Sequence, residues 1–243
     1  MGEVTIPSPT IESRLDTFRP YAPSIVDGLT DWVRRLPIPS WLFYVAVAVV
    51  SLLLIASFKW LDGSYPVSIV TWQLILSAAT FPYALAMLHY LDNSAKEALD
   101  DFRPAMQIDE AQFRKLEYQF TTLPARPALI AAGIGALYGV TFPLYASPEE
   151  IERMGFFTSL PTAIFGVFEL ALGYASAGLL LYHSVRQLRM VSRTYTTHAR
   201  IDLFNLAPVH ALSRLAARTA IGIAIITYAW AFVNFEGGEV QAG

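Results

Sequence analysis

The sequence predicts an all-α integral membrane protein: a five-helix transmembrane bundle with amphipathic helices on its cytoplasmic side. Apolar residues make up 54% of the 243-residue chain and charged residues only 15%, whereas soluble domains carry roughly 25% charged residues. The chain also contains five apolar stretches of about 20 residues each, the length of a helix that crosses a bilayer. Their approximate bounds are 41–60, 67–91, 127–146, 162–182 and 215–235.

Residues 1–40 form a lead-in to the five-span domain of residues 41–243. Acidic residues such as Glu3 and Asp16 precede any apolar run, which is not the pattern of a cleaved signal peptide. Several prolines favour an extended chain up to Pro23. Apolar residues then recur at helical spacing, as expected either for a short helix on the membrane surface or for a structured linker. These residues are Ile25, Leu29, Trp32, Val33 and Leu36.

Charge alternates between the segments that join the spans. Lys and Arg gather in segments 92–126 and 183–214, whereas loop 147–161 and the C-terminal tail are mainly acidic. By the positive-inside rule the N-terminus is cytoplasmic and the C-terminus lies outside, which suits a bacterial or archaeal cell membrane. Lys59, at the outer end of the first span, is the one charge that does not fit this pattern.

The two basic segments are predicted to be helical. In segment 92–126, Pro104 separates two helices and Asp109 is placed to cap the second, so the segment is a folded cytoplasmic helical hairpin. In the fourth span, neither Gly nor Pro interrupts Leu179–Tyr195. This helix is therefore expected to continue past the membrane, to about residue 195.

A cluster of basic residues follows the fourth span and opens the fifth. Arginine forks bind phosphates, and basic clusters beside membrane helices attract anionic lipids. One interpretation is thus a patch that binds an anionic lipid head group or another phosphate. The other is that these residues only set the topology of the chain. The candidates are Arg186, Arg189, Arg193, Arg200, His210, Arg214 and Arg218.

Glu169 is the acidic residue that lies well inside a predicted span. Such a residue is costly in a bilayer, so it is expected to face the bundle interior or a cavity. It could belong to a proton or cation path or to a polar ligand site, or it could simply make an interhelical hydrogen bond. Polar residues at a similar predicted depth, which could form one layer with Glu169, are Gln73, Tyr138, Thr227 and Tyr228.

Small residues predict close packing of the third and fourth spans. Gly135 and Gly139 form a GxxxG pair in the third span, and Gly166 and Gly173 share a helix face with Glu169 in the fourth. Small residues on facing sides let two helix backbones approach closely. We therefore expect these two faces to meet.

Several functional classes are disfavoured. Net charge is −3, so no overall basic balance indicates a nucleic-acid partner, and the absence of Cys excludes disulfides and thiolate metal sites. The four histidines, His89, His183, His198 and His210, have no metal-ligand spacing. With no recognisable catalytic motif either, the sequence predicts no metal, no cofactor and no enzymatic activity. The alternative left open is a lipid-modifying enzyme that uses His210 and arginine residues.

Two functional hypotheses stay open at this point. The first is a homo-oligomeric ion channel or small transporter that uses the polar layer around Glu169. The alternative is a non-catalytic sensor, assembly or lipid-binding structural subunit that uses the basic cytoplasmic patch. The expected partners are membrane lipids, anionic ones in particular, further copies of the chain, and proteins that bind the cytoplasmic helices.

Overall fold

The computed structural model describes residues 20–61, 63, 71–154, 159–197 and 207–239, and this part of the chain is all-helical without a β-sheet. Five helices are long and apolar enough to span a membrane. The predicted fold class, an all-α bundle with five candidate spans, is therefore confirmed. The candidate spans are Ser40–Leu61, Trp72–Ala105, Ala125–Leu144, Leu160–Thr197 and His210–Asn234.

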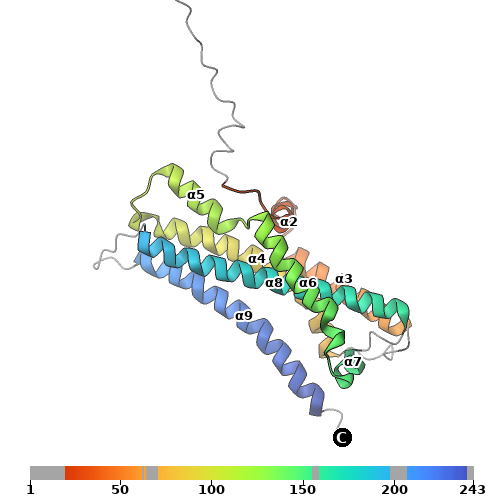
Figure 1. Cartoon of the computed structure of the whole chain (residues 1–243). Helices are drawn as coiled ribbons and strands as arrows, with labels where there is room; N and C mark the ends of the chain where they lie inside the picture. The colour runs from red at the N-terminus through yellow and green to blue at the C-terminus, as the bar shows by residue number, and fades with distance from the viewer. Residues whose placement is uncertain (1–19, 62, 64–70, 155–158, 198–206, 240–243) are drawn as a thin grey trace, which may run out of the picture.

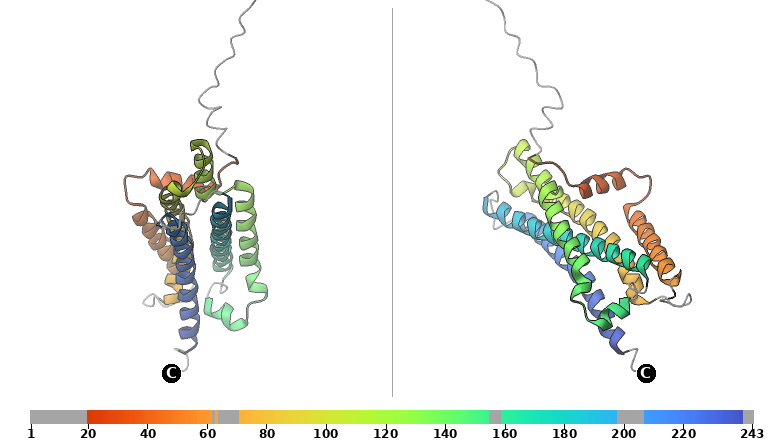
Figure 2. Two further views of the ribbon diagram at one scale, coloured as in Figure 1. Left: turned by 90° about the vertical axis from the view of Figure 1, so that its left-hand side faces the viewer. Right: turned by 45° about the vertical axis from the view of Figure 1, so that its right-hand side comes forward.

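The bundle is organised around two long helices, α4 (Trp72–Phe102) and α8 (Leu160–Thr197). Helix α4 contacts α3 (Ser40–Leu61), α8 and α9 (Ala207–Glu239), while α8 also packs along α6 (Ala125–Thr141). Figures 1 and 2 show the shorter α5 (Glu110–Thr121) at one end of the bundle and α7 (Pro148–Met154) at the other. These are called the α5 end and the α7 end below.

Both central helices are longer than a bilayer crossing requires. At 1.5 Å per residue, the 38 residues of α8 extend for about 57 Å, against an apolar membrane core of roughly 30 Å. Helix α4 contains Pro82 but runs on as one helix through residue 91 to Phe102. The first helix of the predicted hairpin is thus the end of α4, because neither Gly nor Pro interrupts the chain between His89 and Phe102.

Helix α5 folds back onto the ends of α4, α8 and α9. The Asp109 side chain caps it, accepting a hydrogen bond from the Gln112 amide at 2.7 Å. Phe113 and Phe120 of α5 are buried in one apolar cluster with Phe102 of α4 and Leu212 of α9. Burying side chains of this size stabilises the hairpin by roughly 2 kcal/mol each. The α5 end is therefore a packed structure that can hold side chains in fixed positions.

The N-terminal helix α2 (Ile25–Arg34) is held against the same end. Ser24 and Asp27 form a capping box, and the Asp27 carboxylate also accepts a hydrogen bond from the Leu123 amide at 3.0 Å. Val33 is buried, whereas Ile25 is 85% exposed and Trp32 is also exposed. One face of α2 therefore packs on the bundle, and the other offers apolar side chains to a membrane interface.

Helices α6 and α8 approach at glycines. A Cβ atom added at Gly135 would lie 2.1 Å from the Tyr174 carbonyl oxygen, and one at Gly139 would lie 2.5 Å from that of Leu170. On α8 the close approach includes Gly178, whereas Gly173 borders open space and Gly166 is buried. The side of α8 that meets α6 is thus next to the predicted Gly166–Gly173 face, and the Glu169 face turns elsewhere.

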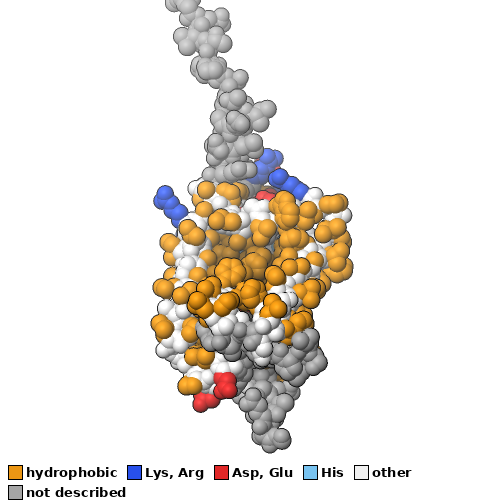
Figure 3. Space-filling view, turned by 90° about the vertical axis from the view of Figure 1, so that its right-hand side faces the viewer, with side chains coloured by type: hydrophobic (Ala, Val, Ile, Leu, Met, Phe, Trp, Pro, Cys, Tyr) orange, Lys and Arg blue, Asp and Glu red, His pale blue; other side chains and the backbone are white. Residues whose placement is uncertain are grey.

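The outer surface has the pattern of a membrane protein. Apolar side chains such as Leu129 and Ile134 of α6, and Ile221 and Ile225 of α9, are exposed. Figure 3 shows hydrophobic side chains over the middle of one face, with Lys and Arg and an acidic side chain at one end and Asp and Glu at the other. An apolar band between charged ends matches the apolar core of a bilayer between its head-group layers.

Candidate functional site

A groove lies between α5 and α8 at the α5 end of the bundle. Its volume is about 890 Å³, within the range of sites that bind small molecules. We call it the basic groove, because three arginines of α8 line it. Its lining residues are Arg186, Arg189, Arg193, Tyr182, Val185, Met190, Ser192, Thr194 and Thr197 from α8, Leu116 and Gln119 from α5, and Tyr21 from the N-terminal segment.

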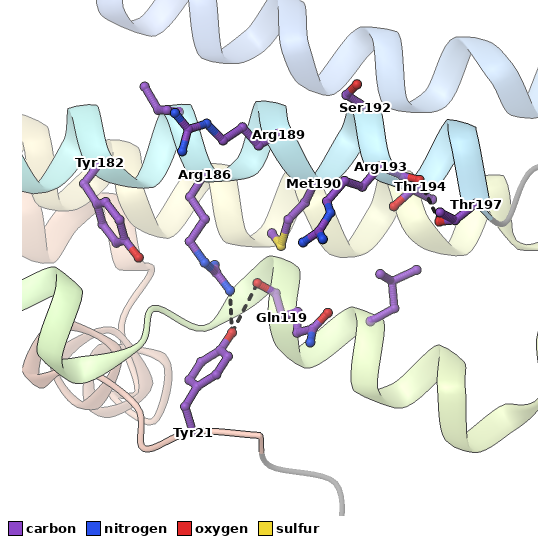
Figure 4. A pocket seen from close by; sticks show the side chains of 12 residues that line it. Tyr21, Gln119, Tyr182, Arg186, Arg189, Met190, Ser192, Arg193, Thr194 and Thr197 are labelled. Carbon is purple, nitrogen blue, oxygen red and sulfur yellow. Dashed lines mark hydrogen bonds between the residues drawn. The ribbon is translucent and has the colours of Figure 1, made fainter.

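Helical spacing explains why the three arginines share this groove. Arg186, Arg189 and Arg193 follow one another at three and four residues, so all three lie along one face of α8. Figure 4 shows Arg186 reaching from α8 down to Tyr21, with Arg193 further along the same helix pointing toward α5. Because α8 is a continuous helix here, it fixes the spacing at which the three arginine side chains leave its backbone.

Tyr21 closes one side of the groove. Its hydroxyl donates a hydrogen bond to the Thr122 carbonyl at 2.9 Å and accepts one from the Arg186 guanidinium, which also lies over the Tyr21 ring. Burial raises the pKa of Tyr21 to about 12. The phenol therefore keeps its proton at neutral pH and remains a hydrogen-bond donor.

The predicted basic patch is divided between two faces. Arg214 of α9 forms an ion pair with Asp101 of α4 at 2.6 Å, and Arg218 pairs with Glu97 at 3.2 Å. His210 is exposed at the start of α9, and Arg200 lies outside the described residues. The structure thus brings Arg186, Arg189 and Arg193 together and places Arg214 and Arg218 with acidic partners on the α4–α9 side.

The charge balance of the two faces is therefore different. Within the described residues, Arg186, Arg189 and Arg193 form no ion pair with a carboxylate. Three positive charges that share a groove without a carboxylate repel one another, and a bound anion would relieve that repulsion. On the α4–α9 side the acidic residues of α4 already supply this compensation.

Glu169 lies in a different environment from the predicted layer. Its carboxyl group interacts with the Lys59 ammonium of α3 and accepts a hydrogen bond from Ser77 of α4. Lys59 is only 4% exposed, and it donates to the Met154 carbonyl at 2.6 Å. Lys59, the charge that does not fit the loop pattern in the sequence, thus acts electrostatically on the intramembrane carboxyl group.

The other members of the predicted layer are not gathered around Glu169. Tyr138 packs against the Tyr174 and Tyr145 rings on the α6 side. The Thr227 hydroxyl donates to the Ile223 carbonyl in its own helix, and Tyr228 is 75% exposed. Gln73 is half-buried at the start of α4. Counting residues along a span predicted their depth but not the direction in which each helix face points.

Sequence reasoning missed three residues that matter at the α5 end. Tyr21 lies in the proline-rich lead-in, where no helical pattern draws attention to it. Asp92 and His183 are buried together between α4 and α8. Both residues stand next to predicted span ends, where polar residues are expected to face the membrane interface. Their burial results from the extension of α4 and α8 into the packed α5 end.

Comparison with protein-family models, with curated proteins and with solved structures gives no match. The class of the protein follows from its own fold: an all-helical chain with five candidate membrane spans.

Proposed function

We propose that this is a non-catalytic membrane protein that binds the phosphate head group of an anionic lipid in the basic groove. The observation that carries the proposal is the contrast between two sets of arginines. Arg214 and Arg218 have carboxylate partners, whereas Arg186, Arg189 and Arg193 line a groove of about 890 Å³ without one among the described residues. Guanidinium groups hold phosphate oxygens through paired hydrogen bonds, so such a groove is suited to a phosphate.

The lining also suits the apolar part of a lipid. Leu116 of α5, with Tyr182, Val185 and Met190 of α8, supplies apolar surface beside the arginines. Leu181 and Val185 are exposed on α8 where it leaves the predicted span. An acyl chain could therefore follow α8 into the membrane while its phosphate stays with the arginines. In this proposal the α5 end faces the cytoplasm, where anionic lipids attract basic residues beside membrane helices.

Native mass spectrometry of the protein in mild detergent tests the proposal. The protein is exposed to phosphatidylglycerol or phosphatidylcholine, and retained lipid is counted for wild type and for two double variants. Arg189→Ala with Arg193→Ala should lose most of the retained phosphatidylglycerol. Arg214→Ala with Arg218→Ala removes the same charge from the paired face and should retain it. Equal loss from both variants would contradict the proposal, because it would indicate attraction by net charge alone.

Ion transport around Glu169 has less support. The Lys59 ammonium acts on the Glu169 carboxyl group and Ser77 donates a hydrogen bond to it, while Glu169 Oε2 has no hydrogen-bond partner among the described residues. Thr227 and Tyr228 lie on the outside of the protein. These contacts favour an interhelical polar contact as the role of Glu169. Flux through proteoliposomes that disappears in Glu169→Gln would reverse this preference.

Self-association and protein partners at α5 stay predictions.

A further inference from the structure

A buried acid–base pair lies behind the basic groove. Asp92 of α4 and His183 of α8 are 5% and 1% exposed, and the Asp92 Oδ1 atom is 3.6 Å from the His183 Nε2 atom. This separation is too long for a hydrogen bond. Within the described part of the chain, Asp92 Oδ1 and both ring nitrogens of His183 have no hydrogen-bond partner. Buried polar atoms without partners are uncommon and call for a reason.

The pair is in electrostatic contact with the basic groove through Arg186. This arginine is three residues after His183 on α8, lines the groove, and acts on both Asp92 and His183. Burial disfavours the charged form of both groups most strongly. The Arg186 guanidinium opposes this effect at Asp92, where it favours the carboxylate, and adds to it at His183, where it disfavours a protonated imidazole. Arg186 thus belongs to two sites at once, the exposed groove and the buried pair.

Other charged and titratable groups also face the Asp92–His183 pair. The groups on α2 and α3 that act on Asp92 are Asp27, Asp31, Arg34 and Tyr44, and His89 of α4 is hydrogen-bonded to both Arg34 and Tyr44. The charged groups of the remaining helices are engaged elsewhere or exposed. They include Glu117 of α5 with Lys96, Arg214 and Arg218 of α9 with Asp101 and Glu97, and Arg126 of α6 on the surface.

The number of protons on the pair decides its charge. A carboxylate beside a neutral imidazole carries one negative charge, which is costly in the interior unless a cation such as Arg186 lies nearby. One added proton makes the pair neutral overall. An anion bound in the basic groove would offset the positive charge of Arg186 and so weaken the interaction that favours the negative form. Proton binding at the pair and anion binding in the groove are therefore positively coupled.

We propose that Asp92 and His183 form a proton-binding site that takes up a proton when the basic groove binds its anionic lipid. The proposal rests on the proposed function, because it needs an anion in the groove. It adds that the protein couples lipid binding to pH. The lipid should bind more tightly in acid, and its affinity should fall by up to about tenfold for each unit of rising pH while one proton is exchanged.

Calorimetric titration of the full chain in non-ionic detergent tests this inference. The probe is a short-chain phosphatidylglycerol, because its phosphodiester does not itself titrate near neutral pH. Binding is measured between about pH 5 and about pH 8, where an imidazole can change its charge. Buffers with different heats of ionisation then count the protons that accompany binding. Uptake of up to about one proton per lipid is expected.

Variants locate the proton. Asp92→Asn should still bind the lipid but without proton uptake, whereas His210→Gln, which alters an exposed histidine at the same end, should keep the uptake of wild type. Uptake that persists in Asp92→Asn overturns the assignment to this pair. If Asp92→Asn does not fold, the proton count of wild type decides. Lipid binding that is accompanied by no proton exchange at every pH tested overturns this inference and leaves the proposed function in place. Absence of lipid binding at every pH overturns the proposed function as well.

Discussion

The Arg186 guanidinium of α8 donates a hydrogen bond to the phenol of Tyr21, 165 residues earlier in the chain. Tyr21 in turn donates to the Thr122 carbonyl, and its own carbonyl accepts from the Tyr118 hydroxyl at 2.8 Å. One tyrosine thus joins the N-terminal segment, helix α5 and the chain between α5 and α6 to the first arginine of the basic groove. The groove has a wall that depends on a residue outside the five spans.

Replacing Tyr21 with Phe should loosen this wall. The variant keeps the aromatic ring but loses the hydrogen bond to Thr122 and the acceptor for Arg186, so we expect a loss of about 1 kcal/mol in stability. The sensitive measurement is hydrogen exchange at the amides near Thr122, which should become faster. Tyr90→Phe is the matched control, because the Tyr90 hydroxyl makes no hydrogen bond among the described residues. Equal exchange in wild type and Tyr21→Phe would contradict the role of the phenol.

The docking of α2 should weaken as pH rises. Burial raises the pKa of Asp27 above its ordinary value of 3.8, although hydrogen bonds from Ser24 and Leu123 oppose the shift. A carboxyl group with a raised pKa in the folded state binds its proton more tightly there than in the unfolded state. Its contribution to stability is therefore complete at low pH and is lost as pH rises through the raised pKa.

Asp27→Asn provides the test of this titration. The amide cannot ionise, so the stability of wild type relative to the variant should decline from about pH 4 upward, as Asp27 loses its proton. Thermal unfolding in detergent across a pH series gives the difference directly. A difference that is constant with pH, or that changes in the opposite direction, would show that the folded state does not raise the pKa of Asp27.

Gly135 should not tolerate a side chain. The added Cβ atom of Gly135→Ala would lie 2.1 Å from the Tyr174 carbonyl oxygen, a rigid backbone atom, so α6 and α8 would have to separate. We expect a loss of about 2 kcal/mol from this overpacking. Gly133→Ala is the control in the same helix, because nothing lies within 4 Å of its added Cβ atom. Equal melting temperatures for the two variants would contradict the close approach of α6 and α8.

The contributions of Lys59 and Glu169 to stability should be coupled. Removing one partner leaves a charge inside the bundle without its counterion, so Lys59→Met or Glu169→Gln alone should cost about 3 kcal/mol. The double variant should be more stable than the sum of the single losses implies. A thermal-stability cycle in detergent measures this coupling. Strictly additive losses would show that the two charges do not interact, and Glu169 would again need another role.

The sequence predicted the positions of the helices along the chain more accurately than the neighbours that each helix face contacts. The lengths of the apolar stretches located five candidate spans, because a bilayer imposes one length on every helix that crosses it. The acidic residue Asp109, followed by an amphipathic pattern, likewise indicated the start of α5. Both signals are local, so they can be read from neighbouring residues.

The site was predicted only in part, because its geometry depends on long-range packing. The spacing of Arg186, Arg189 and Arg193 placed them on one helix face, and the structure adds the α5 wall that turns this face into a groove. Nothing local shows that Arg214 and Arg218 would meet Asp101 and Glu97, since this contact requires α4 to extend beside α9. The Glu169 face was likewise assigned to α6, whereas Glu169 accepts a hydrogen bond from Ser77 of α4 and is influenced by the charge of Lys59 of α3.

Mapping a photoreactive anionic phospholipid onto the protein tests the central claim most directly. The lipid carries its reactive group beside the phosphate, and cross-linked peptides are identified by mass spectrometry. The proposal predicts adducts on groove residues such as Gln119 of α5 and Met190 of α8, which unlabelled phosphatidylglycerol should prevent and phosphatidylcholine should not. Adducts confined to the α4–α9 face near Arg214, or spread evenly over the α5 end, would contradict a lipid site in the basic groove.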